Sequence, residues 1–425
     1  MGVIKNFDQL ATSPQRKVVL QLIEEAFASI QPSHVFNQHI QRNGDELTIQ
    51  GQTFDLSQFE KVFVVGFGKG SSGICKLLEQ VLGDRLTAGW DIDVVEETFA
   101  KIAYTKGTHP LPSDTNIFFT ERVLDATRGL TEKDLVLVVV CGGGSAMFES
   151  PYKASLETLD AISTALLRSG ATISEMNVIR KHVSKVKGGD FAKHLYPATV
   201  ITLIFSDVPG SDLSVIASGP TVMDHTTLEE AMHIVDKYGL LTAVPNIHDL
   251  MMDLPHEDKY FTNVHNLLIV SNQTALQAMS EKAKALGFTP RIFSDKFQGD
   301  AKVVGKNLIN ECKDHEILLV GGETTVHVTG SGKGGRNQSL VVASLPYLHD
   351  DTVIASFDSD GQDFYYFTGA IADEHTLIKA LALGLDPKSF LDDDNSYEFL
   401  QKVGDGIFTD KLESNVSDLM IVFKQ

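Results

Sequence analysis

Six short apolar runs constrain the fold of this chain most, because small or polar residues follow each of them at once. The runs are KVFVV (61–65), DLVLVVV (134–140), TVITLIF (199–205), NLLIV (266–270), EILLV (316–320) and TVIAS (352–356). Such unbroken β-branched runs are typical of strands buried on both faces of a parallel sheet. Helical patterns lie between them, and strands that alternate with helices predict βαβ units. Because ligands bind beyond the carboxyl ends of such strands, we expect the six following segments to gather at shared sheet edges.

The length of the chain predicts two α/β domains, since its 425 residues exceed the size of a typical single domain. The segment 224–263 is irregular and polar, so we predict domains at 1–240 and 241–425, joined by a linker within 235–260. The first domain is expected to hold a Rossmann-like, mostly parallel sheet between helices. The second is expected to be a smaller α/β domain. The helical pattern at 12–30 could pack on either.

Composition argues against several classes of protein. The chain carries 56 acidic and 36 basic residues, a formal charge of −20, which disfavours binding to nucleic acid or to anionic membranes. No apolar stretch approaches the roughly 20 residues that span a bilayer, and the N-terminus shows no signal peptide. Cys75, Cys141 and Cys312 are far apart, so neither a disulfide framework nor a zinc site is expected. A reducing cytoplasm fits this pattern best.

The first glycine-rich segment, GFGKGSSG, follows the run at 61–65. Gly66 and Gly68 begin a GxG pattern, but Ser71 occupies the third glycine position of a dinucleotide-binding fingerprint. No convincing acidic residue marks the end of a second strand, as that fingerprint requires. The alternatives are a turn whose amides and Lys69 bind a phosphate, and a plain tight turn.

Two further segments follow the second and third runs. Gly142, Gly143 and Gly144 would let a ligand approach the backbone, and Ser145 could hydrogen-bond that ligand or begin a helix. Asp207 comes directly after its strand, where a carboxylate can bind Mg²⁺ or merely close a turn. No P-loop sequence occurs in the chain, which argues against that class of nucleotide-binding fold.

The densest glycine segment, GGETTVHVTGSGKGGRNQSL, follows the fifth run. Glu323 lies at its start, and Lys333 and Arg336 lead into a helix, where the arginine fork suits a carboxylate or a phosphate. A flexible hairpin loop is the alternative. The sixth run precedes SDGQD, and its acidic residues, Asp360 among them, would repel one another unless a metal, a proton or a base intervened. A solvated acidic turn is the alternative there.

The segment NVIRKHVSKVKGG (177–189) concentrates positive charge in an acidic chain. Helical spacing predicts that Asn177, Arg180 and Ser184 share one face and that Lys181 points elsewhere, so truncating Lys181 should be nearly neutral. A solvated basic face is the common fate of such a run. Its position between glycine-rich segments instead favours binding of an anionic substrate or of a transferring phosphoryl group.

The joint order of these motifs resembles a known family. GFGKG, THPLPSD, CGGGSA, NVIRKHVSKVKGG, SDVPGSDLSVIASGP, GGETTV, GKGGRNQ and SDGQD follow one another as in the class II glycerate kinases, whose two parts are called DUF4147 and MOFRL. The resemblance covers about residues 15–420. It implies two α/β domains with the active site in the cleft between them. It also implies transfer of the γ-phosphoryl group of ATP, with Mg²⁺, to a hydroxyl of D-glycerate, giving 2-phosphoglycerate.

The resemblance implies active-site roles for Lys69 and Arg336, and the residue patterns described above suggest the roles of the others. Lys69, Arg336 and Asp207 are expected to be catalytic, and Arg180, Asn177 and Ser145 to bind the substrate. Nucleotide or phosphate binding is expected of Gly66, Gly68, Gly142, Gly143, Gly144, Glu323 and Lys333, and Mg²⁺ binding of Asp207 and Asp360. The chain departs from the family pattern most clearly at 359–364, where SDGQDF replaces TDGxDG.

The expected partners are a small hydroxy acid and ATP, without nucleic acid or membrane, in a monomer or a homodimer. Two alternatives stand beside the kinase: an NAD(P)H-dependent hydroxypyruvate reductase, and a non-catalytic protein that binds a small anion on the same fold.

Overall fold

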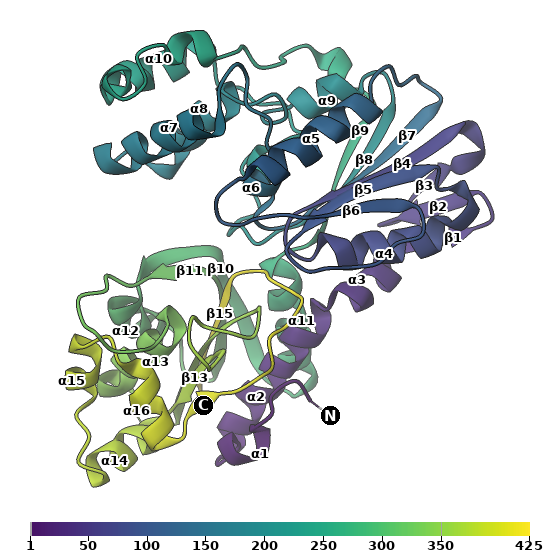
Figure 1. The fold of residues 1–425 in the computed structure, drawn as a ribbon. Helices are drawn as coiled ribbons and strands as arrows, with labels where there is room; N and C mark the ends of the chain where they lie inside the picture. The colour runs from purple at the N-terminus through teal and green to yellow at the C-terminus, as the bar shows by residue number, and fades with distance from the viewer. Residues whose placement is uncertain (1, 350) are drawn as a thin grey trace. The chain divides into compact units, whose positions relative to one another are not determined.

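A computed structural model describes residues 2–349 and 351–425, which divide into two compact units. The parallel-sheet unit consists of Phe36–Ser206 and Ser211–Ile269. The mixed-sheet unit consists of the residues up to Val35, of Asp207–Gly210 and of Val270–Gln425. Each unit has its own sheet between helices, which confirms the predicted α/β class (Figure 1).

The parallel-sheet unit is built on a sheet with the strand order β6-β5-β4-β7-β8-β9, in which the pairs from β6 to β8 are parallel. The strands are β4 (Lys61–Phe67), β5 (Ala88–Asp93), β6 (Ile102–Lys106), β7 (Asp134–Val140), β8 (Thr199–Phe205) and β9 (Val264–Val270). The first three apolar runs therefore form adjacent parallel strands, and their carboxyl ends lie at one edge, as predicted.

Helices cover both faces of this sheet (Figure 1). On one face lies α4 (Ser71–Leu82), and on the other lie α5 (Asp114–Ala126) and α9 (Asp190–Leu195). Right-handed crossovers require this arrangement, because the chain moves from β4 to β5 in one direction and returns past β4 to β7 in the other. The unit also contains α3 (Pro32–His39, which begins before the unit), α6 (Gly144–Met147) and a small antiparallel sheet of β1 (Ile40–Asn43), β2 (Glu46–Ile49) and β3 (Gln52–Asp55).

Three further helices of this unit share an apolar core of their own. They are α7 (Leu156–Ser169), α8 (Ile173–His182) and α10 (Leu228–Lys237). Leu159, Ile162 and Leu166 of α7 are buried in that core together with Ile179 of α8 and Ile234 of α10. The expectation that helices lie between the strands is confirmed here, since α7 and α8 come between β7 and β8.

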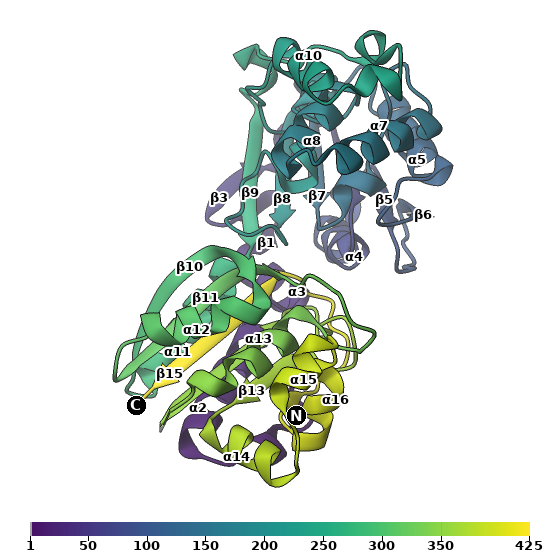
Figure 2. The same ribbon diagram turned by 90° about the vertical axis from the view of Figure 1, so that its left-hand side faces the viewer.

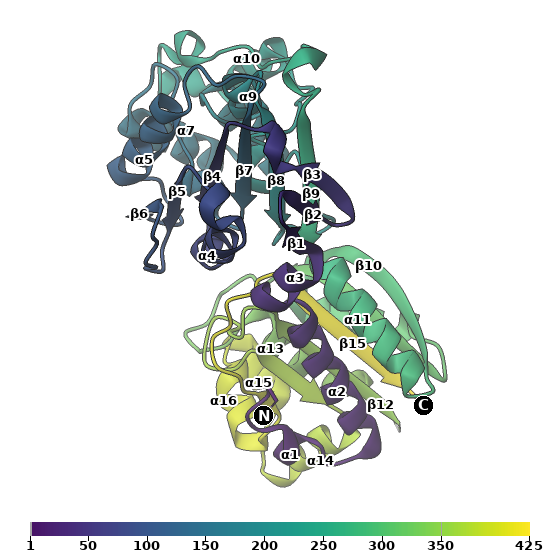
Figure 3. The ribbon, with the colours of Figure 1, turned by 90° about the vertical axis from the view of Figure 1, so that its right-hand side faces the viewer.

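The mixed-sheet unit has the strand order β10-β11-β15-β12-β13-β14, with only β10 and β11 parallel among its neighbours. Its strands are β10 (Thr289–Asp300), β11 (Glu316–Thr325), β12 (Thr352–Asp358), β13 (Gly369–Ala372), β14 (Gly406–Ile407) and β15 (Asp418–Lys424). Figure 2 shows α12 (Ala301–Glu311) and α13 (Arg336–Ser344) on one face of the sheet. Figure 3 shows α2 (Pro14–Ser29) and α11 (Asn272–Ala285) on the other. The remaining helices are α1 (Phe7–Leu10), α14 (Glu374–Ala382), α15 (Pro387–Asp392) and α16 (Ser396–Val403).

The units divide the chain at residues other than the predicted boundary at 240/241. The division falls at 269/270, and the N-terminal helix α2 belongs with the C-terminal residues. Arg16 of α2 is buried and forms ion pairs with Asp373 at 2.7 Å and Asp405 at 2.9 Å. A chain end held by a buried arginine cannot be placed from local sequence, because its partners lie more than 350 residues away. Within the described residues, no helix is both long enough and apolar enough to cross a membrane.

Candidate active site

The turn after β4 presents Lys69 at the carboxyl edge of the parallel sheet. Gly68 has φ +108, and a Cβ there would lie 2.4 Å from the carbonyl oxygen of Cys141, so only glycine fits. The backbone N–H of Lys69 donates to the carbonyl of Gly142 at 2.8 Å, which ties this turn to the triple-glycine turn after β7. The Lys69 side chain is exposed. Two segments predicted to share an edge are therefore in direct contact.

Asp93, at the end of β5, fixes the other side of the Lys69 turn. Its Oδ2 accepts hydrogen bonds from the backbone N–H groups of Gly70 at 3.0 Å and Ser72 at 3.2 Å, and from the Ser72 hydroxyl at 2.5 Å. The N-terminus of α4 is thus already capped by a carboxylate of the chain. This differs from the predicted role of the turn amides, with Gly66 and Gly68, in phosphate binding, and it leaves Lys69 as the group of this turn that can meet an anion.

Asp93 also corrects one step of the sequence argument. An acidic residue does stand at the end of the second strand, where a dinucleotide-binding fold uses one to hold the ribose. Its carboxylate is turned inwards, however, with Oδ1 accepting from the N–H of Val94 at 2.6 Å and Oδ2 engaged by the turn. The chain thus has an acidic residue where the dinucleotide-binding fingerprint requires one, but the carboxylate of Asp93 binds the backbone of the turn and is not available to a ribose.

Gly66 and Asp91 lie beneath the turn, inside the sheet. A Cβ on Gly66 would lie 2.3 Å from the Cys75 sulfur and 2.4 Å from Oδ1 of Asp91, so this glycine makes room for packing. Asp91 accepts a hydrogen bond from Ser71 at 2.7 Å. Burial raises the pKa of Asp91 to about 7, and the nearby charge of Asp93 adds to the shift. The carboxyl that supports the turn from below is therefore mostly protonated at pH values below about 7.

The triple-glycine turn after β7 packs against a histidine. Gly143 has φ +77, and a Cβ there would lie 2.7 Å from the His109 ring. Burial lowers the pKa of His109, and the charge of Lys69 lowers it further, so the imidazole is neutral at physiological pH. Ser145 shares a hydrogen bond of 3.0 Å with Ser218. We call Lys69, His109 and residues 142–145 the glycine-turn cluster.

The basic segment 177–189 is largely neutralised inside the unit. Lys181 is buried, with 5% of its surface exposed, and forms an ion pair with the buried Asp224. The prediction that Lys181 lies on a neutral, removable face is therefore wrong, because a carboxylate 43 residues away holds its ammonium group. Lys187 is buried against Glu149, and Lys185 pairs with Glu121 at 2.6 Å in a half-exposed position.

Arg180 is the exception within that segment. It is half-buried near the end of α8, and among the described residues it forms no hydrogen bond or ion pair. Burial lowers the pKa of Arg180, partly offset by the charge of Glu149. Asn177 lies one turn earlier on the same helix, whereas Ser184 lies beyond the helix end and donates to Glu149 at 2.7 Å. The predicted face thus retains Asn177 and Arg180 but loses Ser184.

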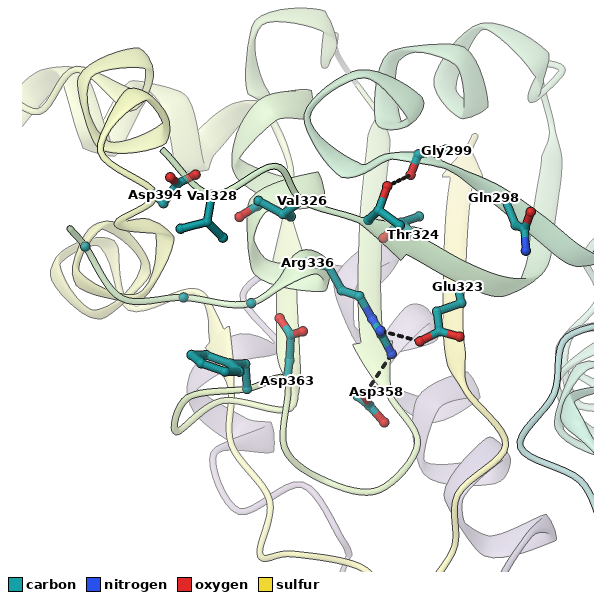
Figure 4. A pocket seen from close by; sticks show the side chains of 16 residues that line it. Gln298, Gly299, Glu323, Thr324, Val326, Val328, Arg336, Asp358, Asp363 and Asp394 are labelled. Carbon is teal, nitrogen blue, oxygen red and sulfur yellow. Dashed lines mark hydrogen bonds and ion pairs between the residues drawn. The ribbon is translucent and has the colours of Figure 1, made fainter. Parts of the chain in front are cut away.

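The mixed-sheet unit contains a pocket of about 1140 Å³ beyond the ends of β11 and β12 (Figure 4). Arg336, the first residue of α13, lies in it and forms ion pairs with Glu323 at 2.6 Å, Asp418 at 2.7 Å and Asp358 at 3.5 Å. Glycines of the segment 332–335 also line the pocket. We call Glu323, Arg336, Asp358 and Asp418 the Arg336 cluster.

Three carboxylates surround one guanidinium in this cluster, so negative charge is in excess. Asp418 is fully buried, and burial raises its pKa against the opposing charge of Arg336. Burial also raises the pKa of Asp358, with added repulsion from Asp418 and Asp360. Burial alone would lower the pKa of Arg336, but these carboxylates raise it overall. Additional positive charge near Asp358 would relieve the repulsion.

Buried polar side chains behind Arg336 hold the cluster in place. Nδ2 of Asn337 donates to Asp418 at 2.8 Å, and the backbone N–H of Gln338 donates to Asp363 at 2.8 Å. Burial raises the pKa of Asp363 to about 6. The hydroxyl of Thr324, which lines the pocket, is buried and has no hydrogen-bond partner among the described residues. A polar ligand in the pocket would satisfy it.

Lys333 and the two predicted metal ligands occupy other positions. Lys333 is exposed, with its ammonium 4.9 Å from the centre of the Tyr365 ring. The carboxylate of Asp360 accepts from the N–H of Gln362 at 2.9 Å, and the carbonyl of Asp207 accepts from the Ser417 hydroxyl. In the part of the chain that the structure describes, no three His, Cys, Asp or Glu side chains are grouped as a ready metal site.

Sequence reasoning missed several residues that build these clusters. Asp93 and Asp418 stand at strand ends, which is a signal that could have found them. His109 lies in THPLPSD, a motif without an assigned role in the sequence argument. Asn337 follows Arg336 directly, but its buried contacts with Asp418 give no local signal.

Comparison with known proteins places these features in context. Residues 18–252 match the Domain of unknown function (DUF4147), and residues 316–418 match the MOFRL family. The chain is 34% identical to the Glycerate 2-kinase of Pyrococcus horikoshii, over 96% of each chain. It is also 34% identical to the D-glycerate 2-kinase of Thermotoga maritima, over 87% of this chain and 92% of the relative.

A solved structure and a differently named relative complete the comparison. The crystal structure of a glycerate kinase from Thermotoga maritima matches with a TM-score of 0.86 at 31% identity, covering 96% of this chain and 99% of that chain. A relative from Agrobacterium vitis, 34% identical over 84% of this chain and 98% of its own length, bears the name hydroxypyruvate reductase only provisionally.

Proposed function

The chain belongs to the glycerate kinase family, and from that premise we propose that it transfers the γ-phosphoryl group of ATP to the 2-hydroxyl of D-glycerate. One observation carries the proposal beyond the family likeness: an arginine held by three carboxylates at the floor of a glycine-lined pocket. Phosphoryl transfer depends mainly on positioning and on neutralising charge. The Arg336 guanidinium, fixed by its carboxylates, would position the phosphoryl group, and a bound cation would neutralise the excess acidic charge.

We assign the roles as follows. Arg336 binds and stabilises the charge of the phosphoryl oxygens, and Lys69 supplies a second positive charge. Arg180, whose charge is not taken up by a carboxylate at hydrogen-bond distance, pairs with the substrate carboxylate, and Asn177 and Ser145 hydrogen-bond the substrate. Gly142, Gly143 and Gly144 let an anionic group approach the backbone. Glu323 and Lys333 flank the nucleotide.

The donor set around Arg336 fits Mg²⁺. That ion is usually bound by one or two carboxylates together with water and the phosphates of its nucleotide, so a complete protein cage is not needed. The charges of Asp360 and Asp418 help to raise the pKa of Asp358, and a cation bound beside Asp358 would favour its ionised form. Asp360 is a second candidate ligand, and Asp207 is a further candidate catalytic and metal-binding carboxylate. When bound, Mg²⁺ neutralises charge on the transferring group.

Cys75, Cys141 and Cys312 are buried and form no disulfide among the described residues, which suits a reducing compartment, and we propose that the protein acts in the cytoplasm.

The function is tested by incubating the protein with MgATP and D-glycerate and then adding enolase. Enolase consumes 2-phosphoglycerate directly, whereas 3-phosphoglycerate would first need a mutase. We expect ADP release and direct consumption by enolase, and neither with L-glycerate. Oxidation of NADH with hydroxypyruvate, without ADP release, would instead establish the reductase, and no turnover in either assay would leave an anion-binding protein.

A further inference from the structure

One aromatic side chain at the Arg336 pocket has no packing role in the fold. Phe364 lines the pocket, yet 84% of its surface is exposed. It begins a run of four aromatic residues, of which Tyr365, Tyr366 and Phe367 all contact the ring of Tyr397. Among the described residues, Phe364 makes no ring contact at all. Burial of apolar surface in the core therefore does not explain why a phenylalanine stands here.

The backbone at Phe364 is held in a conformation that phenylalanine rarely adopts. Its φ is +61, in the left-handed region that favours glycine. Such strain persists only where the surroundings enforce it, and it concentrates at ligand sites.

The helix that carries Arg336 also enforces this conformation. Nε2 of Gln338 donates to the carbonyl of Asp363 at 3.0 Å and to the carbonyl of Tyr365 at 3.1 Å, on either side of Phe364. The backbone N–H of Gln338 further holds the Asp363 carboxylate at 2.8 Å. The position of the Phe364 backbone is thus fixed relative to Arg336, two residues before Gln338.

The pocket has a charged part and an apolar part. Glu323 and Asp358 gather around the guanidinium of Arg336, whereas Val326 and Val328 lie away from it, towards Asp394 (Figure 4). Val328 is 69% exposed and lines the pocket, as Phe364 does. The volume of about 1140 Å³ exceeds that of most small-ligand pockets. Because Arg336 lies among carboxylates, the charged part suits a polyanion that arrives with a cation, and an exposed aromatic ring suits a flat group. The magnesium complex of a nucleoside triphosphate has both.

We propose that Phe364 is the platform on which the purine base of the nucleotide stacks, in the pocket that Val326 and Val328 also line. The proposal rests on the proposed function, because it deepens the nucleotide site of that reaction. Stacking on an aromatic ring tolerates different bases, since every base has a π-face. The site should therefore take ATP and GTP alike and should not depend on the hydroxy acid.

Equilibrium binding by calorimetry tests the base site directly, with the full chain and the magnesium complexes of ATP, GTP and inorganic tripolyphosphate. In Phe364→Ala we expect the Kd for ATP and GTP to rise about 5- to 150-fold, which is the range of base–aromatic stacking. The Kd for tripolyphosphate should stay within about twofold. Phe364→Trp should keep the wild-type affinity for ATP, and Phe293→Ala, an exposed phenylalanine of β10 that does not line the pocket, is the matched control.

Phe364→Gly distinguishes the effect of the aromatic ring on ATP binding from the effect of backbone strain on stability. Because glycine relieves the strain at φ +61, its unfolding temperature should equal or exceed that of the wild type, while its ATP affinity falls as in the alanine variant. Unchanged ATP affinity in both variants, or an equal loss for tripolyphosphate, overturns the base site.

Binding of the base at Phe364 and phosphorylation of D-glycerate can be tested independently of one another. A wild-type protein that binds ATP through Phe364 but does not phosphorylate D-glycerate keeps the base site and loses the kinase. Normal turnover with unchanged ATP affinity in Phe364→Ala keeps the kinase and loses the base site. A wild-type protein that does not bind ATP overturns both.

Discussion

The parallel-sheet unit and the Arg336 cluster of the mixed-sheet unit differ in how their cations are paired. In the parallel-sheet unit, the carboxylates Asp224, Glu149 and Glu121 take up the lysines of the basic segment. Lys69 and Arg180 have no such partner among the described residues. In the mixed-sheet unit, a single arginine is held by three carboxylates. One unit therefore offers uncompensated positive charge, and the other offers a fixed arginine in an acid-rich setting.

This difference teaches that the charge of a sequence segment is not the charge of the surface it forms. The segment 177–189 is rich in lysine, but Lys181, Lys185 and Lys187 form ion pairs with carboxylates of the same unit. The segment 332–336 has one lysine and one arginine, and its arginine lines the pocket of the mixed-sheet unit. Removing a buried, paired lysine of the segment 177–189 should therefore lower the stability of the protein, whereas removing Lys69, Arg180 or Arg336 should change the kinetic constants.

The largest effect is expected for Arg336→Ala. Its loss removes a charge at the transferring group, which typically lowers kcat on the order of 10²–10³-fold. It also leaves Glu323, Asp358 and the buried Asp418 unpaired, at about 3–5 kcal/mol of unfolding free energy. Steady-state kinetics and denaturant unfolding measure the two losses.

A double variant separates those losses. Arg336→Met combined with Asp418→Asn should recover much of the stability without recovering activity, because the neutral pair no longer buries an uncompensated charge. Recovery of turnover in this variant would show that Arg336 is structural only.

Lys69→Ala should lower kcat by about 10²–10³-fold while changing the unfolding free energy by less than about 0.5 kcal/mol. The side chain is exposed and holds nothing in place, so the loss is confined to the reaction. Lys61→Ala, at the opposite end of β4, is the control and should behave as the wild type. Wild-type turnover in Lys69→Ala would remove the lysine from the mechanism.

Lys181→Ala should cost about 3–5 kcal/mol of unfolding free energy, because it strands the buried Asp224 without its cation. Lys185→Ala is the control from the same segment, since its pair with Glu121 is half-exposed and should contribute less than about 1 kcal/mol. Denaturant unfolding of both variants checks this difference. Equal stability of the two would contradict the view that the basic segment is neutralised from within.

These contrasts also show how far the sequence predicts the molecule. The runs at 134–140 and 199–205 form β7 and β8 at the predicted residues, because a buried strand is encoded by its own side chains. The contact of the turns after β4 and β7 follows from parallel topology alone.

What the sequence could not predict depends on partners that are distant along the chain. Arg16 meets Asp373 and Asp405, and Lys181 meets Asp224, so neither the domain boundary nor the role of the lysine is visible locally. Asp93 shows the converse limit: its position was predictable, but the inward turn of its carboxylate was not.

Arg180→Ala should raise the KM for D-glycerate about 10- to 100-fold and leave kcat within a few-fold, since a bond to the substrate carboxylate exists in both ground and transition states. Lys185→Ala again serves as control and should leave both constants unchanged. A fall in kcat at constant KM would instead place Arg180 at the phosphoryl group. Unchanged constants would return Arg180 to the solvated face of α8.

A further contrast concerns the buried carboxyls of Asp91, beneath the Lys69 turn, and Asp418. Among the described residues, Asp91 has no cationic partner of the kind that Arg336 provides for Asp418. The pKa of Asp91 is raised to about 7, whereas an unfolded aspartate titrates near pH 4. Between about pH 4 and 7 the native state therefore holds the extra proton, and the contribution of Asp91 to stability falls as pH rises.

Asp91→Asn should remove this dependence. The variant should match the wild type near pH 4 and exceed it above pH 7 by on the order of 1–4 kcal/mol of unfolding free energy. Asp125→Asn, an exposed carboxylate of α5, is the control and should leave the pH profile unchanged. Because the introduced amide could still accept the Ser71 hydrogen bond, a variant that is less stable at every pH would mean that the carboxylate itself, rather than its proton, supports the Lys69 turn.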